Sequence, residues 1–143
     1  MALSVAQVRS AVAAKVVGLA GFKEINIPPE YFGRIENTIA HLGFGIMTAS
    51  SSAVSERQRR VVGLYLSTTL RVMFAYRLRP HDAYPTDYDR ALDKEQEVIA
   101  AVMGVYNSPV EIRFERATRR CPDSIEYMIS DIEFTVLHTI TNT

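Results

Sequence analysis

The chain has 143 residues, of which 48% are hydrophobic, so it is long enough to bury the core of one domain spanning residues 1–143. Sixteen basic residues balance sixteen acidic ones. This balance argues against a protein that binds nucleic acid by itself, because such proteins carry a basic excess. Cys121 is the only cysteine, which excludes an intramolecular disulfide and a thiolate zinc cluster. No apolar run reaches the length of about 18 residues that a membrane-spanning helix needs.

The first predicted element is a helix that begins after Ser4. Ser4 and Gln7 have the spacing of a capping box, in which each side chain bonds the backbone of the other residue. Apolar residues then recur at every third or fourth position, on one face of a helix: Val5, Val8, Val12, Val16 and Leu19. Gly21 is expected at the C′ position, where glycine commonly ends a helix.

The next stretch predicts two extended segments and a loop. Residues 22–28 alternate in polarity and stop at Pro28 and Pro29, after which residues 30–37 indicate a short helix or an irregular turn. Residues 41–50 alternate again and predict a strand, whose two glycines suggest a bulge or the close approach of another element. The segment Ser50 to Arg60 is rich in serine and arginine without apolar periodicity, which predicts a surface loop.

A long strand is predicted over residues 64–78. Successive side chains of a strand point to opposite faces, so one face carries these residues: Leu70, Val72, Phe74, Tyr76 and Leu78. The other face is mixed and partly wettable, which is typical of a half-buried antiparallel strand: Thr69, Arg71, Met73, Ala75 and Arg77. The usual strand has only about 5 to 6 residues. We therefore expect either a bend near residues 67–69 or an overhang that pairs with another chain.

A second helix is predicted after Thr86. Thr86 is expected as its N-cap, because Asp87 and Asp89 then lie at the positive end of the helix dipole. A stripe at helical spacing follows: Tyr88, Ala91, Leu92, Glu95, Val98, Ile99 and Val102. Gly104 is expected at the C′ position of this helix.

Two further strands are predicted at the end of the sequence. Val110 to Thr118 alternates apolar and charged residues, and Ile125 to Ile140 follows a turn. In the last strand the parity of the apolar residues switches across Ser130 and Asp131, which predicts a β-bulge there. The order α-β-β-α-β-β predicts an α+β fold, a two-layer sandwich in which two hairpins form an antiparallel sheet with both helices on one face.

Residues that could carry catalysis or bind a metal are few. The three histidines fall on separate predicted elements without ligand spacing, and His81 with Asp82 is expected on a solvated loop. Cys121 follows two arginines, but no motif of a catalytic thiol accompanies it. We therefore expect no metal, no cofactor and no catalytic thiol.

Charged residues gather on the predicted loop, near the second hairpin turn and on the second helix. These charges either form solvated faces or meet complementary charges between copies of the protein. The second interpretation defines a candidate assembly interface: Arg57, Arg59, Arg60, Asp87, Asp89, Asp93, Arg116, Arg119 and Arg120.

The order and character of these segments resemble a known family. A helix ends in Gly21-Phe22, and a strand with the sequence HLGFGIM precedes a polar loop. A long strand, TLRVMFAYRLRP, leads into an acidic helix, DYDRALDKEQEVIAAVM, and the final strand reads SDIEFTVLHT. In this order the chain resembles the tail terminator proteins of long-tailed bacteriophages, together with the related tail-completion and minor tail proteins. The resemblance covers nearly the whole chain, but no single motif is diagnostic.

The resemblance implies a structural virion protein without catalytic residues. Tail terminators form a hexameric ring that caps the head-proximal end of the tail tube, stops its growth and joins the tail to the head. The implied partners are further copies of the chain, the tail-tube protein and a head–tail connector or neck protein, with DNA only as cargo through the lumen and no membrane. Assembly would take place in the host cytoplasm. The alternatives are another head–tail joining protein, or a small α+β ligand-binding domain or enzyme.

Overall fold

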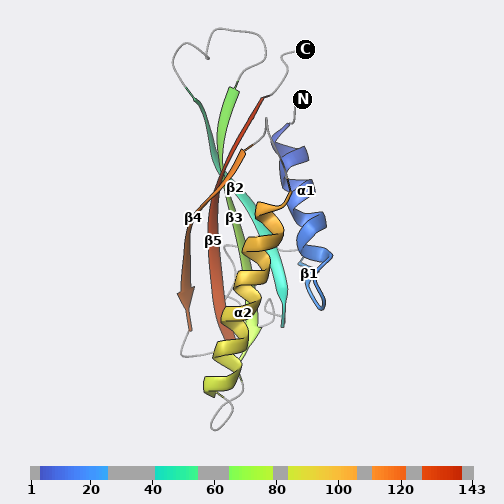
Figure 1. The fold of residues 1–143 in the computed structure, drawn as a ribbon, viewed down its shortest axis with the longest axis vertical. Coiled ribbons are helices and arrows are strands. Elements are labelled where there is room, and N and C mark those ends of the chain that lie inside the picture. Colours follow the sequence, from blue (N-terminus) through green and yellow to red (C-terminus); the bar gives the residue numbers. More distant parts are fainter. Residues whose placement is uncertain are drawn as a thin grey trace.

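The computed structural model describes residues 4–25, 41–54, 65–78, 84–105, 111–121 and 127–139. In chain order its elements are α1 (Val5–Val17), β1 (Lys23–Glu24), β2 (Gly43–Ala53), β3 (Tyr65–Arg77), α2 (Tyr84–Met103), β4 (Glu111–Arg120) and β5 (Tyr127–Thr139). The strands form one sheet, and both helices pack on the same face of it (Figure 1).

The sheet has five strands in the order β1-β2-β3-β5-β4. β1 runs parallel to β2, whereas the other neighbouring strands are antiparallel. The predicted antiparallel sheet of two hairpins, with the order α-β-β-α-β-β, is therefore wrong, because the chain forms a mixed α+β fold with an additional edge strand. An extended segment after the first helix is predicted correctly, but its pairing is not. That pairing depends on where residues 23–24 meet residues 43–44 in space.

The first helix follows its local signals at one end only. Ser4 and Gln7 form the predicted capping box, which satisfies backbone donors that the first turn leaves unbonded. The helix ends at Val17 with Gly18 as its C-cap, so the prediction of Gly21 at C′ is wrong. Gly21 instead has a φ of 86° in the turn toward β1, and a Cβ there would lie 2.8 Å from Cδ1 of Leu42. A side chain at this position would be strained, so the turn requires glycine.

The main core lies between the helices and the sheet. Phe22, Phe44 and Phe74 pack edge to face, with ring centroids of Phe22 at 6.3 and 5.5 Å from the other two. The alternation of β3 is confirmed, since Leu70, Val72 and Phe74 are fully buried on this face. The opposite face is mixed, as predicted, with Thr69 and Arg71 half-buried and Arg77 exposed. A smaller cluster of Met73, Ala75 and Ile129 is buried there, with Ile25 and Tyr127 packed against it.

The predicted bulge in the last strand is wrong. β3 and β5 pair without a shift from Tyr65 opposite Thr139 to Arg77 opposite Tyr127. Shifts occur instead in β2, between Thr48 and Ser50, and in β4, between Phe114 and Arg116. The apolar pattern of β5 switches parity in the sequence because a polar residue, Ser130, faces the helices while Ile129 packs in the cluster on the other face. The side chains of β5 still alternate between the two faces, because its pairing with β3 has no shift.

Other predicted boundaries shift or fall outside the described residues. α2 begins before Thr86, which lies inside the helix and is not its N-cap. β2 continues to Ala53, so the first residues of the predicted loop belong to a strand, paired as far as Leu66 of β3. The register shift in β2 lies opposite Thr69 of β3. This is the region of the long strand in which the sequence predicts either a bend or the start of an overhang. The short helix or turn predicted over residues 30–37 lies outside the described residues.

Candidate assembly interface

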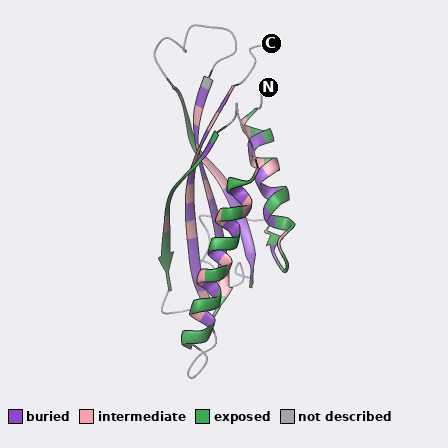
Figure 2. Ribbon diagram, viewed as in Figure 1, coloured by how far each residue is buried: buried purple, intermediate pink, exposed green. Residues whose placement is uncertain are grey.

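β4 forms one edge of the sheet and is the most exposed of the long strands (Figure 2). Within it Ile112 is buried, whereas Phe114 keeps 43% of its surface exposed although it points to the helix side and stacks edge to face on Phe134. An edge strand offers unpaired backbone donors and acceptors to another strand. β4 therefore combines an open edge with an exposed aromatic side chain.

β2 forms most of the opposite edge. β1 pairs with it only at Gly43 and Phe44, so the rest of β2 has no outer strand neighbour among the described residues. Proteins usually protect such edges with charged residues or proline. The sequence of β2, GFGIMTASSSA, contains neither, so its edge is suited to accept a strand.

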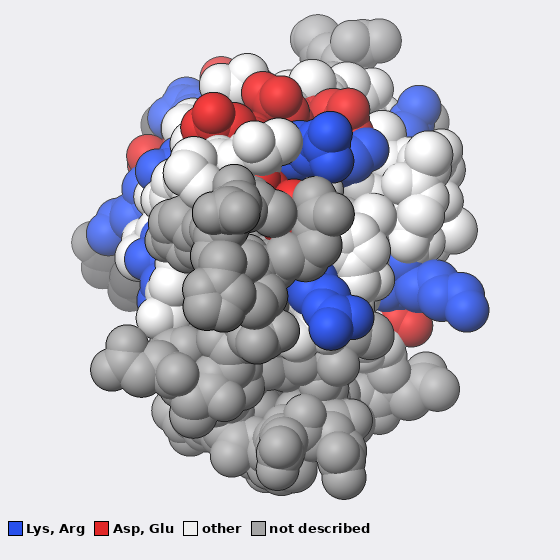
Figure 3. All heavy atoms as spheres, turned by 90° about the horizontal axis from the view of Figure 1, so that it is seen from below, with Lys and Arg blue, Asp and Glu red and all other residues white. Residues whose placement is uncertain are grey.

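The outer surface of α2 carries the acidic residues of the predicted interface. Asp89 and Asp93 are exposed, and Glu97 continues their spacing of four residues with an ion pair to Lys94 at 3.1 Å. Like charges at this spacing destabilise a helix by about 0.2–0.5 kcal/mol per pair. Figure 3 looks onto the end of the molecule where α2 begins and shows acidic side chains gathered along one rim. Asp87, by contrast, is only 3% exposed and does not belong to this surface.

Arg116 and Arg119 of the predicted interface form ion pairs within the chain. Arg119 forms a two-pronged ion pair with the buried carboxylate of Glu95, at 2.9 and 2.5 Å, and the hydroxyl of Ser130 donates to the same carboxylate at 2.7 Å. The hydrogen bonds that Arg119 donates to Glu95 raise the pKa of Arg119. On the other face of the sheet, Arg116 pairs with Glu133 at 3.1 Å. Arg119 thus fastens the edge strand to α2.

The remaining predicted interface residues separate into two groups. Arg120 is exposed at the end of β4. Arg57, Arg59 and Arg60 lie outside the described residues, as do His81 and Asp82. The described interface residues thus lie on two elements. Asp89 and Asp93 are on α2, whereas β4 carries the arginines Arg116, Arg119 and Arg120.

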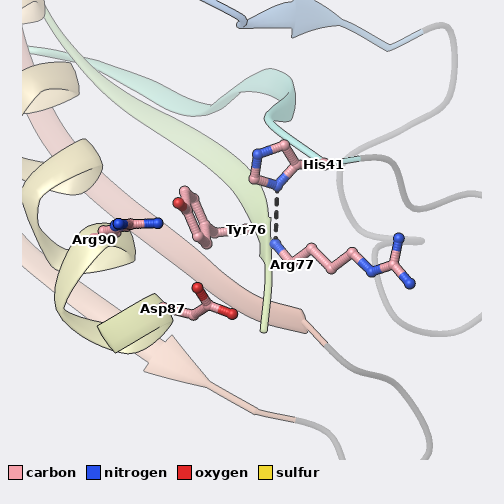
Figure 4. Close-up of a pocket in the computed structure, with 5 residues that line it drawn as sticks. All are labelled: His41, Tyr76, Arg77, Asp87 and Arg90. Atoms are coloured by element: carbon pink, nitrogen blue, oxygen red, sulfur yellow. Dashed lines mark hydrogen bonds between the residues drawn. The ribbon is translucent and has the colours of Figure 1, made fainter. Parts of the chain in front are cut away.

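A pocket of about 330 Å³ lies where β3 meets the start of α2 (Figure 4). It is lined by His41, Tyr76, Arg77, Asp87 and Arg90. The backbone N–H of Arg77 donates to Nδ1 of His41 at 3.1 Å, so this nitrogen carries no proton here. Burial, followed by the charge of Arg77, lowers the pKa of His41. In Figure 4 the side chain of Arg77 points away from the other four, so the pocket offers Arg90, Asp87, Tyr76 and His41 to a small polar ligand.

A network of polar side chains crosses the sheet on the helix side. Ser51 and Thr68 share a hydrogen bond of 2.8 Å, and Thr68 bonds Nε2 of His138 at 2.7 Å. Thr68 and His138 are fully buried, and buried polar groups of this kind are normally paired. The sequence did not predict this network, because its members lie on three strands, up to 87 residues apart, and follow no periodic pattern.

Comparisons with known proteins do not identify the chain. No protein-family model matches it, and no curated protein matches it. In the described part of the chain, no cluster of three or more histidine, cysteine, aspartate or glutamate residues could hold a metal ion. None of the described helices is both long enough and apolar enough to cross a membrane.

Proposed function

We propose that the protein is a tail terminator of a long-tailed bacteriophage. In this role copies of the chain close into a hexameric ring at the head-proximal end of the tail tube. One face of the ring contacts the tube and stops its growth, and the other contacts a connector or neck protein. DNA passes through the lumen as cargo. The protein would be assembled in the host cytoplasm and reside in the virion.

The observation that carries this proposal is the uncharged edge of β2. A ring with one face toward the tube and one toward the head needs all its copies to point the same way, so each contact must be head to tail. The sheet offers two different long edges, β2 and β4, as such a contact requires. Addition of a neighbour's strand to the edge of β2 would extend the sheet through backbone hydrogen bonds.

Charge can set the partner and the orientation of this contact. Asp89 and Asp93 are exposed on α2, and we propose that they meet Arg57, Arg59 and Arg60 of a neighbour, in the segment that the sequence predicts as a loop. Complementary charges across an interface mainly steer encounter and fix register. Salt would therefore weaken assembly of the ring.

The test is co-sedimentation of the purified protein with tail tubes, followed by electron microscopy of the tube ends. We expect rings at one end of each tube. Lysines at two exposed positions of β2, Ser50→Lys with Ser52→Lys, should abolish them, because edge lysines block strand addition. The matched control is Ala14→Lys on exposed α1 surface, which should assemble normally. A wild-type protein that never binds tubes would contradict the proposal.

The pocket favours a second candidate, a small ligand-binding domain. Its polar groups converge from three parts of the chain: His41 before β2, Tyr76 on β3, and Asp87 with Arg90 on α2. This candidate predicts that small organic acids raise the melting temperature and that Arg90→Ala removes the effect. No stabilisation by a panel of such acids would argue against it.

A further inference from the structure

The bulge in β4 gives its two halves opposite parity. Phe114 lies opposite Phe134 on the helix side, and Ala117 lies opposite Ile132 on that same side. Without a bulge, residues 114 and 117 would point to opposite faces of the sheet. Glu115 is the extra residue, and it stands near the middle of the strand Glu111–Arg120.

We propose that the free protein forms a two-fold dimer by antiparallel pairing of β4 with β4 of a second copy. The two-fold axis passes between residues 115 and 116. Opposed residues are then Glu111 with Arg120, Ile112 with Arg119, Arg113 with Thr118, Phe114 with Ala117, and Glu115 with Arg116. Each of these pairs occurs twice, because the contact is isologous.

The faces of the two strands agree in this register. Residues directly opposite each other in an antiparallel pair must lie on the same face of the sheet. Phe114 and Ala117 both lie on the helix side, and Glu111 and Arg120 both lie on the other side, where they oppose Leu137 and Ile129 of β5. The pairing would thus continue one sheet through both copies, and it would cover part of the exposed ring of Phe114.

The charges select this register over its neighbours. A slip of one residue sends the side chains of one strand to the wrong face. A slip by two residues in one direction places Arg113 opposite Arg116. In the other direction it places Arg113 opposite Arg120, and it also opposes Arg116 to Ala117, which lie on different faces of the sheet. Like charges directly opposite each other are destabilising. Of the three registers, only the proposed one opposes acids to bases at Glu111 and Glu115.

A charged edge strand can also be read as protection against pairing. That protection relies on like charges that repel an approaching copy. The charges of β4 instead alternate in sign, with acids in its first half and bases concentrated in its second, so an inverted copy is attractive. Arg113 already bonds Glu111 within the strand at 3.2 Å, which leaves the carboxylate between two bases in the dimer.

This dimer goes beyond the proposed function and does not rest on it. An isologous contact closes on itself and cannot propagate into a ring. The dimer would occupy β4 and leave β2 open, so it would hold the free protein apart from ring assembly until β4 is released.

The experiment is sedimentation equilibrium of the purified full chain without any tail component. We expect a monomer–dimer equilibrium for the wild type. Glu111→Arg and Arg120→Glu should each weaken dimerisation by about tenfold, because each replaces two opposite-charge contacts with like-charge contacts. The double variant exchanges the charges and should restore the wild-type dissociation constant. Lys15→Glu, on exposed α1 surface, is the matched control and should leave it unchanged.

Circular dichroism melting of each variant separates a folding defect from an interface defect. If the single variants lost dimerisation because they fold poorly, the double variant, which carries both changes, would fold poorly as well. Restored dimerisation in the double variant therefore assigns the loss to the interface. A wild type that stays monomeric up to millimolar concentration overturns the proposal. A dimer that both single variants leave intact also overturns it, since the contact then lies elsewhere.

Discussion

The ion pair between Glu95 and Arg119 should be strongly asymmetric when one partner is removed. Glu95 has a side chain only 2% exposed, whereas that of Arg119 is 41% exposed. Arg119→Met would leave a buried carboxylate that still accepts a hydrogen bond from the hydroxyl of Ser130. Removing one partner of a buried pair costs about 3–5 kcal/mol. We expect about 3 kcal/mol, at the low end, because Ser130 still donates.

Glu95→Gln should cost less than Arg119→Met. The amide oxygen can still accept from Ser130, and the half-exposed guanidinium of Arg119 can be hydrated. A neutral hydrogen bond contributes about 0.5–1.5 kcal/mol, so we expect a loss in that range. The double variant should be about as stable as Glu95→Gln alone, because no buried charge remains to be left unpaired.

Urea unfolding at pH 7, followed by circular dichroism at protein concentrations low enough to keep the chain monomeric, measures these free energies of unfolding. The control is Arg116→Met, the same change on the same strand. Arg116 forms an ion pair with Glu133, and the side chain of Arg116 is 71% exposed. Loss of this exposed pair should therefore cost about 0–1 kcal/mol. If Glu95→Gln costs more than Arg119→Met, or if the two losses simply add, the argument from unequal burial fails.

Four other outcomes can be measured on the same protein. Phe74→Ala should lower the free energy of unfolding by about 3–5 kcal/mol because Phe74 is fully buried, whereas Phe114→Ala, at 43% exposed, should cost clearly less. Gly21→Ala should cost about 1–2 kcal/mol, because a left-handed backbone penalises a Cβ; an unchanged urea midpoint would contradict this. The lowered pKa of His41 means that the unfolded chain binds its proton first as pH falls. Stability should therefore decline below about pH 6.5 toward the lower folded pKa, and His41→Asn should remove this part of the pH dependence. Replacing Arg57, Arg59 and Arg60 together by glutamate should leave the melting temperature nearly unchanged and impair ring assembly. A much lower melting temperature would instead show that these arginines stabilise the fold.

Local patterns determined several elements before any tertiary contact is considered. The capping box of Ser4 with Gln7 needs only residues within one helical turn. The buried face of β3 follows from the two-residue period of a strand, and Leu70 and Phe74 are buried as that period requires. The apolar stripe of α2 is likewise visible in the sequence, and Ala91, Val98 and Val102 are all buried.

Tertiary structure decided the features that join distant segments. The pairing of β1 with β2 and the bulge in β4 depend on the register between strands, which no local pattern specifies. Glu95 lies in an otherwise apolar stripe, and Arg119 and Ser130 are 24 and 35 residues away from it. The sequence therefore predicted Arg119 as an intermolecular contact, whereas the structure uses it within the chain. The physical reason is that a buried charge needs a partner near it in space, and only the folded sheet sets which residue comes near.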